Sequence, residues 1–369
     1  MHHFLNCLLE LEHDVKHITI ETHKHPFEIE EYPKEIRIKT NPEAIFVNTK
    51  INPAHALTHL FSSKSYNIHR FYNTEFEQKL TSHFANNQTD IIIIESIYLA
   101  EYLPTIKHFS SAKVIVRTHN IEHEIWINKS KTSNNIFKKI YLHKLAKDLK
   151  KIELDFLSNV DLIFSISKRD QQLFQTLGCI TKNIIIPLTI DIPPISNTYQ
   201  NHNFFFLGAM NWGPNKEAVH LLSNIIFPNI KKKNASSKLL LAGSYMKTNK
   251  PITNGIEYRG YVEDLQAFIS ESGILLTPIQ SGSGVRIKIL ECMAAGVPII
   301  TSPKGIEGIE VEHQKEVLIA KNNFEFVKFA EELINSKEKR KQIGANAQEF
   351  IKANHAKQNI VNILNEYIK

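Results

Sequence analysis

The sequence predicts an α/β protein with two domains, each built on a parallel sheet whose strands alternate with helices. Three observations lead to this prediction. The length of 369 residues suits two domains of ordinary size, and 42% apolar residues can supply two cores. Short apolar runs alternate with helix-spaced segments along the chain. A proline-containing segment at 191–195 divides this series into two halves and is typical of an exposed linker.

The first half begins with a helix over 3–12, inside an alternating pattern. The four consecutive isoleucines of the strand over 90–95 predict burial on both faces, as in a parallel sheet. Ser167 is a suitable N-cap for the helix over 169–177. The further strands predicted here cover 15–22, 44–48, 113–117, 160–165 and 183–187, and the further helices cover 53–61, 74–85, 96–106 and 134–157.

The helix over 134–157 carries many lysines opposite an apolar stripe. Such a helix packs its apolar side on a core and leaves its lysines in water, or it lies on an anionic membrane. We expect the first arrangement. The stripe consists of Ile136, Phe137, Ile140, Leu145, Leu149 and Ile152.

The second half repeats the alternation and predicts six strands joined by crossover connections, hence a second parallel sheet. The strands cover 204–207, 238–242, 256–258, 274–277, 297–301 and 317–320, with helices over 216–232, 264–270 and 285–295. The last segment, 341–369, is predicted to be helical.

The segment 281–302 combines a glycine turn, a helix and a strand. Gly282 and Gly284 bracket the turn, and Arg286 and Lys288 fall in the first turn of the predicted helix. Cations at the positive end of a helix dipole are unfavourable unless an anion binds among them. Glu291 lies on the same apolar helix and needs hydroxyl or cationic partners. The pattern therefore favours a diphosphate near the cations and sugar hydroxyls near Glu291, against an ordinary turn with a Lys288–Glu291 pair.

This run, Gly-Ser-Gly-Val-Arg-Ile-Lys-Ile-Leu-Glu-Cys-Met-Ala, resembles the donor-binding signature of glycosyltransferase family 4. The resemblance implies the glycosyltransferase-B fold of two Rossmann-like domains, over 1–192 and 193–350, with 351–369 returning to the first. It also implies a retaining transfer from a nucleoside diphosphate sugar to an acceptor hydroxyl, with no metal or further cofactor. The donor-side positions that match are Gly208, Met210, Trp212, Asn215, Val262, Gly282, Ser283, Gly284, Val285 and Glu291, with Arg286 and Lys288 at the leaving diphosphate.

The pattern Arg-x-His-Asn-x-Glu after the strand over 113–117 also resembles the family, whose N-terminal domain carries an active-site histidine. We assign that role to His119 by resemblance; otherwise a histidine here would be expected to cap or pack the loop. His123 is four residues further on, but no third metal ligand is evident.

The chain departs from the family in two places. The family's two glutamates are eight positions apart; Glu291 matches the second, but Ser283 stands at the first. The strand and glycine loop that open the family's first domain are missing, and that strand is usually central. Its omission leaves two unpaired inner edges unless another segment fills the gap, and we expect that the natural chain begins upstream of Met1.

Composition excludes several classes of protein. No apolar run is long enough to span a membrane, and the three distant cysteines indicate free thiols in a cytoplasmic protein. The net charge of +6 suits an anionic ligand or membrane surface, but no nucleic-acid motif accompanies it. Saccharide or lipid-linked acceptors for cell-surface polysaccharide or glycolipid synthesis, with peripheral membrane contact, are implied by the resemblance. Two alternatives stay open: a non-catalytic nucleotide-binding scaffold, and a nucleotide-sugar 2-epimerase of the same fold.

Overall fold

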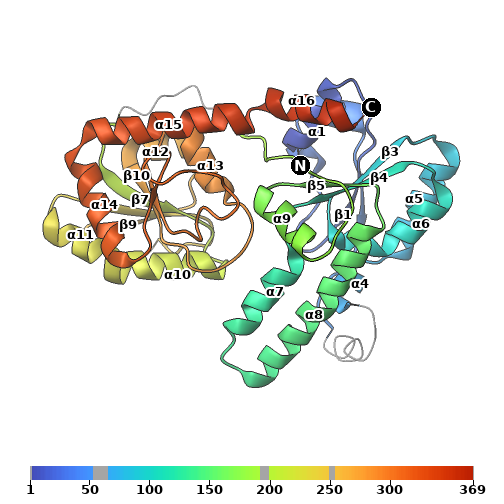
Figure 1. Ribbon diagram of the computed structural model, residues 1–369, viewed down its shortest axis with the longest axis horizontal. Coiled ribbons are helices and arrows are strands. Elements are labelled where there is room, and N and C mark those ends of the chain that lie inside the picture. The colour runs from blue at the N-terminus through green and yellow to red at the C-terminus, as the bar shows by residue number, and fades with distance from the viewer. Residues whose placement is uncertain (1, 53–64, 192–198, 249–253, 369) are drawn as a thin grey trace. The chain divides into compact units, whose positions relative to one another are not determined.

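The computed structural model describes residues 2–52, 65–191, 199–248 and 254–368 (Figure 1). The chain separates into two compact units. Unit 1 comprises Met1–Leu188 and Ile360–Lys369, and unit 2 comprises Thr189–Asn359. The predicted helix over 53–61 and most of the predicted linker over 191–195 lie outside the described residues.

Unit 1 contains a parallel sheet with the strand order β3-β4-β5-β6. The strands are β3 (Ile91–Ile94), β4 (Lys113–Thr118), β5 (Leu162–Ser165) and β6 (Asn183–Ile185). The prediction that β3 is buried on both faces is only partly correct: each face packs against an apolar cluster, but Ile91, Ile92 and Ile93 are only partly buried. The reason is that β3 lies at the edge of this sheet and pairs with β4 alone among the described strands.

Two further strands of unit 1 form a separate sheet. β1 (Ile18–Glu21) pairs in parallel with β2 (Glu43–Phe46), and no described strand joins this pair to β3. The described strands of unit 1 therefore form two separate parallel sheets. Ile18 and Ile20 nevertheless pack against the same apolar cluster as Ile92, so the two sheets share a core.

The helices of unit 1 largely follow the predicted pattern. The predicted helix over 96–106 is divided into a 3₁₀ segment and an α-helix, and Pro104 lies in the first turn of the second part. Ser167 caps α9, where its hydroxyl accepts a hydrogen bond from the Asp170 N–H at 3.2 Å. The helices are α1 (His2–Glu10), η1 (Ile29–Glu31), α2 (Lys34–Thr40), α4 (Tyr66–His69), α5 (Thr74–Asn86), η3 (Ile97–Tyr102), α6 (Leu103–Phe109), α7 (Glu122–Lys131), α8 (Ile136–Ser158), α9 (Lys168–Thr176) and α16 (Lys357–Tyr367).

The last helix, α16, packs with α1 on one face of the four-stranded sheet (Figure 1). Ile360 and Leu364 of α16 join Phe4 of α1 in an apolar cluster with Ile115 and Phe164 from the sheet. All five side chains are buried. Sequence-distant ends of the chain thus form one layer of unit 1.

The predicted core-facing stripe of α8 is only partly correct. Leu145 and Leu149 are buried, but Ile136, Phe137 and Ile140 are exposed. The first turns of α8 lie beside α7 (Figure 1), and among the described residues no element covers the side of these turns that carries Ile136, Phe137 and Ile140.

Unit 2 contains the second predicted sheet, which is parallel throughout and has the order β12-β11-β10-β7-β8-β9. Its central strands are continuous apolar runs, buried as expected between layers of helices. The strands are β7 (Asn203–Leu207), β8 (Leu239–Ala242), β9 (Ile256–Gly260), β10 (Gly273–Thr277), β11 (Ile299–Thr301) and β12 (Leu318–Ile319).

The helices of unit 2 include a π-helical turn within the predicted helix over 216–232. Pro228 has no N–H to continue the α-helical hydrogen bonds, and the π-helical turn directly precedes the segment that contains it. The helices are α10 (Gly213–Leu221), η4 (Leu222–Ile226), α11 (Phe227–Lys233), α12 (Leu265–Ser272), α13 (Ile287–Ala294), α14 (Asn323–Asn335) and α15 (Lys337–His355).

The structure also bears on cysteines and membrane spans. Cys7, Cys179 and Cys292 are buried thiols outside any disulfide within the described residues, as the sequence predicts. Among the described residues, no helix combines the length and the apolar character that a membrane crossing requires.

Candidate functional site

The loops after β7 and β10 leave the sheet of unit 2 from the ends of two neighbouring strands. From β7 the chain proceeds outward to β8 and β9 on one side, and from β10 to β11 and β12 on the other. In open parallel sheets, ligands bind beyond the carboxyl ends of the strands at such a reversal of strand order. The two loops bring together Trp212, Asn215, Arg286 and Lys288, which we call the switch-point cluster.

Asn215 ties the two loops together. Its side chain is buried, its Nδ2 donates to the Ala209 carbonyl at 2.9 Å, and its Oδ1 accepts from Lys288 Nζ at 2.8 Å. A Cβ at Gly208 would lie 2.7 Å from the Asn215 side chain. Glycine at 208 therefore leaves the space that the Asn215 side chain occupies.

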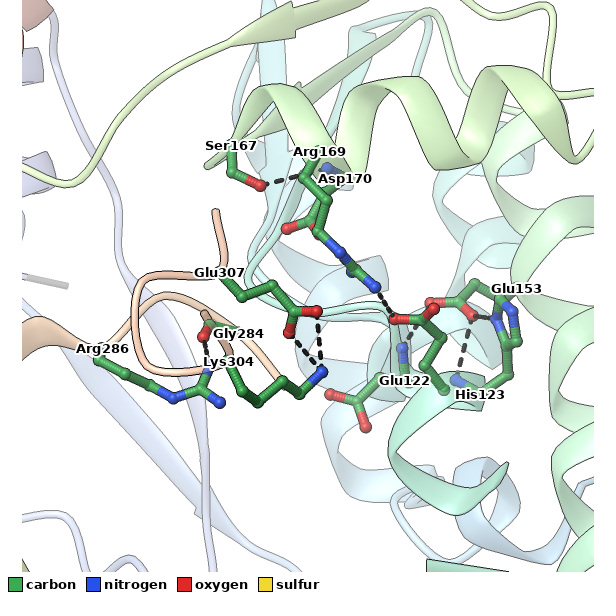
Figure 2. Close-up of polar contacts among 11 residues, drawn as sticks. Glu122, His123, Glu153, Ser167, Arg169, Asp170, Gly284, Arg286, Lys304 and Glu307 are labelled. Atoms are coloured by element: carbon green, nitrogen blue, oxygen red, sulfur yellow. Dashed lines mark hydrogen bonds and ion pairs between the residues drawn. The ribbon is translucent and has the colours of Figure 1, made fainter. Parts of the chain in front are cut away.

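The loop 281–286 folds back on itself at two glycines. Gly282 and Gly284 adopt φ values of +91° and +83°, and a Cβ at Gly282 would lie 2.9 Å from the Trp212 ring. The turn positions the buried Arg286, whose Nη1 donates to the Gly284 carbonyl (Figure 2). Its Nη2 donates to the Ser281 carbonyl at 3.4 Å. The prediction that Arg286 lies in the first helical turn is wrong, because α13 begins at Ile287 and Arg286 is its N-cap.

Lys288 is a partly buried cation that lies near a second cation, Arg286. Burial, together with the charge of nearby Arg286, lowers the pKa of Lys288 to about 8. Its ammonium group lies 4.5 Å from the centre of the Phe206 ring, and the Arg286 guanidinium lies 5.9 Å from that of Trp212. Two partly desolvated positive groups in one cluster repel each other, so an anion placed among them would be strongly stabilised.

The other predicted donor-side residues of unit 2 surround the ends of these strands. Met210 N–H donates to the Ser244 carbonyl at 2.8 Å, and Val262 and Val285 are half-buried in loops. The Ser283 hydroxyl is buried and has no hydrogen-bond partner within the described part of the chain. Glu291 is half-buried on α13, one turn after Lys288.

Two charged residues after β11 were not selected from the sequence. Lys304 Nζ contacts both carboxylate oxygens of Glu307, at 2.8 and 2.7 Å (Figure 2). They follow β11, whose carboxyl end lies beside that of β10. Gly305 leaves space for Thr301, whose Oγ1 would lie 2.1 Å from a Cβ at this position. A lysine and a glycine directly after a buried strand were the sequence signal that could have identified this loop.

In unit 1, His119 lies after β4 and Glu95 lies after the neighbouring strand β3. His119 Nε2 lies 2.7 Å from Glu95 Oε2, and Arg117 Nη1 lies 3.1 Å from the same oxygen. Burial alone would raise the pKa of Glu95, but the His119 and Arg117 contacts outweigh it and leave that pKa below its usual value. The carboxylate therefore stays ionised and holds the half-exposed His119 ring, a role that the sequence analysis missed.

His123 takes no part in this contact. It is buried at the start of α7, where its Nδ1 bonds to Glu153 Oε2 (Figure 2). Glu153 also accepts the backbone N–H groups of Glu122 and His123, at 3.0 and 3.3 Å. His119 and His123 thus have separate partners, and the described residues contain no cluster of three or more side chains suited to a metal ion.

A small polar cavity adjoins both histidine contacts in unit 1. Its volume is about 30 Å³, enough for about one water molecule, and Thr118, His119, Glu122 and Glu153 are among its lining residues. Tyr98 donates to Glu122 at 2.8 Å, and burial raises the pKa of Glu122. The carboxyl ends of β3 and β4 therefore open onto a small cavity lined by polar and apolar side chains.

Comparison with known proteins agrees with this geometry. Residues 201–336, which contain the switch-point cluster, match the family model of the glycosyl transferases group 1. The chain is 26% identical over 291 residues to an uncharacterized 44.6 kDa protein in the cps region of Klebsiella pneumoniae, covering 73% of this chain and 72% of that protein.

Solved structures share the fold. Anabaena HepE in complex with UDP superposes with a TM-score of 0.64 at 14% identity, covering 95% of this chain and 99% of HepE. TarM of S. aureus superposes with a TM-score of 0.60 at 13% identity, covering 80% of this chain but only 58% of TarM. Residues 201–336 are therefore similar to the glycosyl transferases group 1, and the chain shares the glycosyltransferase-B fold of these solved structures.

Proposed function

We propose that the chain is a retaining transferase that moves a hexosyl group from a nucleoside diphosphate sugar to a hydroxyl of a saccharide or lipid-linked acceptor. The observation that carries this proposal is the pair of partly desolvated cations, Arg286 and Lys288, at the switch point of the unit 2 sheet. A solved relative bound to UDP and another bound to UDP and α-GlcNAc-glycerol support the donor class and the acceptor class.

In this mechanism the bond between the anomeric carbon and the diphosphate breaks, the acceptor oxygen forms the new bond at that carbon, and the hydroxyl proton passes to the departing diphosphate. Arg286 and Lys288, with the Gly282–Val285 amides, stabilise the negative charge that develops on the departing diphosphate. The Glu291 carboxylate accepts hydrogen bonds from the ribose hydroxyls. His119, held by Glu95, acts at the transferred sugar. Because two side-chain cations supply the positive charge, we propose that the reaction needs neither a metal ion nor a cofactor besides the donor.

The relative from a cps region supports a role in cell-surface polysaccharide synthesis. Glycolipid intermediates of such syntheses are held in membranes, so an enzyme that uses them meets a membrane surface. We therefore propose peripheral contact with the inner face of the cytoplasmic membrane as part of this function.

Calorimetric titration of UDP and of GDP into the full chain tests the donor site. We expect saturable binding of one nucleotide, weakened at least tenfold in Arg286→Ala, because that change removes a charge-assisted contact worth more than about 1.4 kcal/mol. Arg340→Ala is the matched control: Arg340 is also buried and also donates to backbone carbonyls, those of Leu333 and Tyr199. If both variants stay folded and bind the nucleotide like the wild type, the assignment of Arg286 is wrong.

The divided sheet of unit 1 favours one alternative, a nucleotide-binding scaffold without transfer. That alternative predicts normal nucleotide binding and no release of nucleotide from any nucleotide sugar, whatever acceptor is supplied. Donor turnover above background, abolished in Arg286→Ala, would exclude it.

The affinity for the nucleoside diphosphate should fall as pH rises through about 8. The pKa of Lys288 is depressed to about 8, so the free protein loses this charge above that pH, whereas a bound diphosphate favours the protonated form. Binding should weaken by up to about tenfold per pH unit above 8 and change little between pH 7 and 7.5. Lys288→Arg keeps its charge and should remove this dependence. A nucleotide affinity of the wild type that stays constant from pH 7 to 9.5 would refute this prediction.

The same depressed pKa affects folding with a defined sign. Between pH 8 and the ordinary lysine pKa of 10.5, the unfolded chain binds the proton and the folded chain does not. The contribution of Lys288 to stability therefore rises with pH across this range. Weaker binding above pH 8 can thus be separated from unfolding by a parallel thermal melt.

A further inference from the structure

Helices α7 and α8 lie side by side as an antiparallel hairpin in unit 1 (Figure 1). The outer face of α8 is a stripe of residues three or four positions apart, which lie on one side of a helix: Ile136, Ile140, Lys144, Lys147 and Lys151. This outer stripe is exposed, whereas Leu142, Leu145 and Leu149 on the opposite side are buried. The stripe therefore has an apolar end and a basic end.

The apolar end is unusually exposed for an ordered helix. Phe137 is 81% exposed, Ile140 62% and Ile136 61%. The Asn135 side chain caps this end by accepting the Lys138 N–H at 3.0 Å, so the backbone here is a regular first turn. Three large apolar side chains thus project together from the tip of the hairpin, which is costly in water unless another phase covers them.

The basic end carries more charge than its neighbours neutralise. Lys144 pairs with Asp148 at 2.7 Å. Lys147 and Lys151 have no acidic partner among the residues that the structure describes, and exposed Lys138 and Lys139 add positive charge beside the apolar tip. A face that is apolar at one end and basic along its length matches an anionic lipid surface, with its acyl interior next to phosphate headgroups.

We infer that the outer stripe of α8 and Phe137 dock on an anionic membrane, the apolar tip entering the acyl boundary and the lysines contacting headgroup phosphates. The proposed function supplies the reason for such docking, an acceptor held in the membrane, but not the physical argument for it. A second copy of the chain fits less well. A stable interface buries about 800 Å² per partner, more than three side chains provide, and two like-charged stripes would repel.

Sedimentation with lipid vesicles tests this inference on the full chain. We expect binding to phosphatidylcholine vesicles that contain about 30 mol% phosphatidylglycerol and little binding to phosphatidylcholine alone. Binding should weaken at least tenfold in Phe137→Ser/Ile140→Ser and in Lys147→Gln/Lys151→Gln. It should also be lost at about 1 M salt, where exposed charges are screened.

Matched controls separate the stripe from general surface properties. Phe324→Ser removes another exposed phenylalanine, 74% exposed at the start of α14. Lys337→Gln/Lys341→Gln removes two exposed lysines with the same spacing on α15. Both controls should bind anionic vesicles like the wild type.

Three results would overturn the inference: no binding of the wild type to anionic vesicles, equal losses in the control and stripe variants, or a concentration-dependent dimer that Phe137→Ser/Ile140→Ser dissolves. Nucleotide titration of the same stripe variants keeps the two proposals distinct. If the stripe variants lose vesicle binding but keep their affinity for UDP or GDP, the membrane surface is supported. If the folded wild type binds vesicles but no nucleotide, only the proposed function is contradicted.

Discussion

Replacing His119 by alanine should lower donor turnover by about a hundredfold or more while leaving nucleotide affinity unchanged, because a group that acts at the reacting sugar contributes about 10²–10⁴ in rate. The measurement is release of nucleotide from the nucleotide sugar that the titration identifies, with a membrane extract as the source of acceptor. His108→Ala, an exposed histidine at the end of α6, is the control. Undiminished turnover in a folded His119→Ala variant would remove His119 from the mechanism.

Glu95 acts through His119, and a second variant separates positioning from folding. Glu95→Gln keeps the size of the side chain but removes the charge that lies 2.7 Å from His119 Nε2. We expect a smaller loss than in His119→Ala and a displaced pH profile of turnover, which a purely structural role would not produce. Because the two residues act as a unit, Glu95→Gln should cost little more in the His119→Ala background. Additive losses would contradict the coupling.

Replacing Glu153 by leucine should destabilise unit 1 by about 3 kcal/mol, because two backbone N–H groups and the His123 ring lose their hydrogen-bond partner. Glu153 is 2% exposed and bonds to the His123 ring and to the backbone N–H groups of Glu122 and His123. These are the first two N–H groups of α7, which have no partner inside the helix. Loss of Glu153 therefore removes both the hydrogen-bond partner of the His123 ring and a helix cap.

Guanidinium unfolding followed by tryptophan fluorescence measures this effect. The chain has two tryptophans, so in a Trp212→Phe background the signal reports on Trp126 of α7. Glu153→Gln keeps an acceptor and should be less destabilising, and Asp155→Ala, exposed on the same helix, should change little. A Glu153→Leu midpoint equal to that of Asp155→Ala would show that the cap is dispensable.

The sequence predicts the sheet of unit 2 and its switch-point loops well, because the relevant signals are local. Each strand is a continuous apolar run, and Gly282, Gly284, Arg286 and Lys288 fall within one short segment between two of them. Turn and helix propensities act over a few residues, so one chain suffices to infer them. The start of α13 was misplaced by two residues, as is common for helix boundaries.

The pairs that give the site its chemistry were not predictable in this way. Asn215 and Lys288 are 73 residues apart, and Glu95 and His119 are 24 apart. A sequence indicates that each lies at the end of a strand or the start of a helix, but strand order decides which ends are neighbours. Glu95 was missed for this reason: it follows four isoleucines at the end of a strand, but that position does not show that His119 is its neighbour.

By itself, the sequence determined the alternation of strands and helices, the parallel sheets and the cationic glycine loop. The tertiary structure alone decided that the described strands of unit 1 form two separate sheets and that Glu95 holds His119. It also decided that Ile136, Phe137 and Ile140 are exposed, although their spacing suits a core. Periodicity specifies which side of a helix is apolar, but only the packed chain specifies whether anything lies against that side.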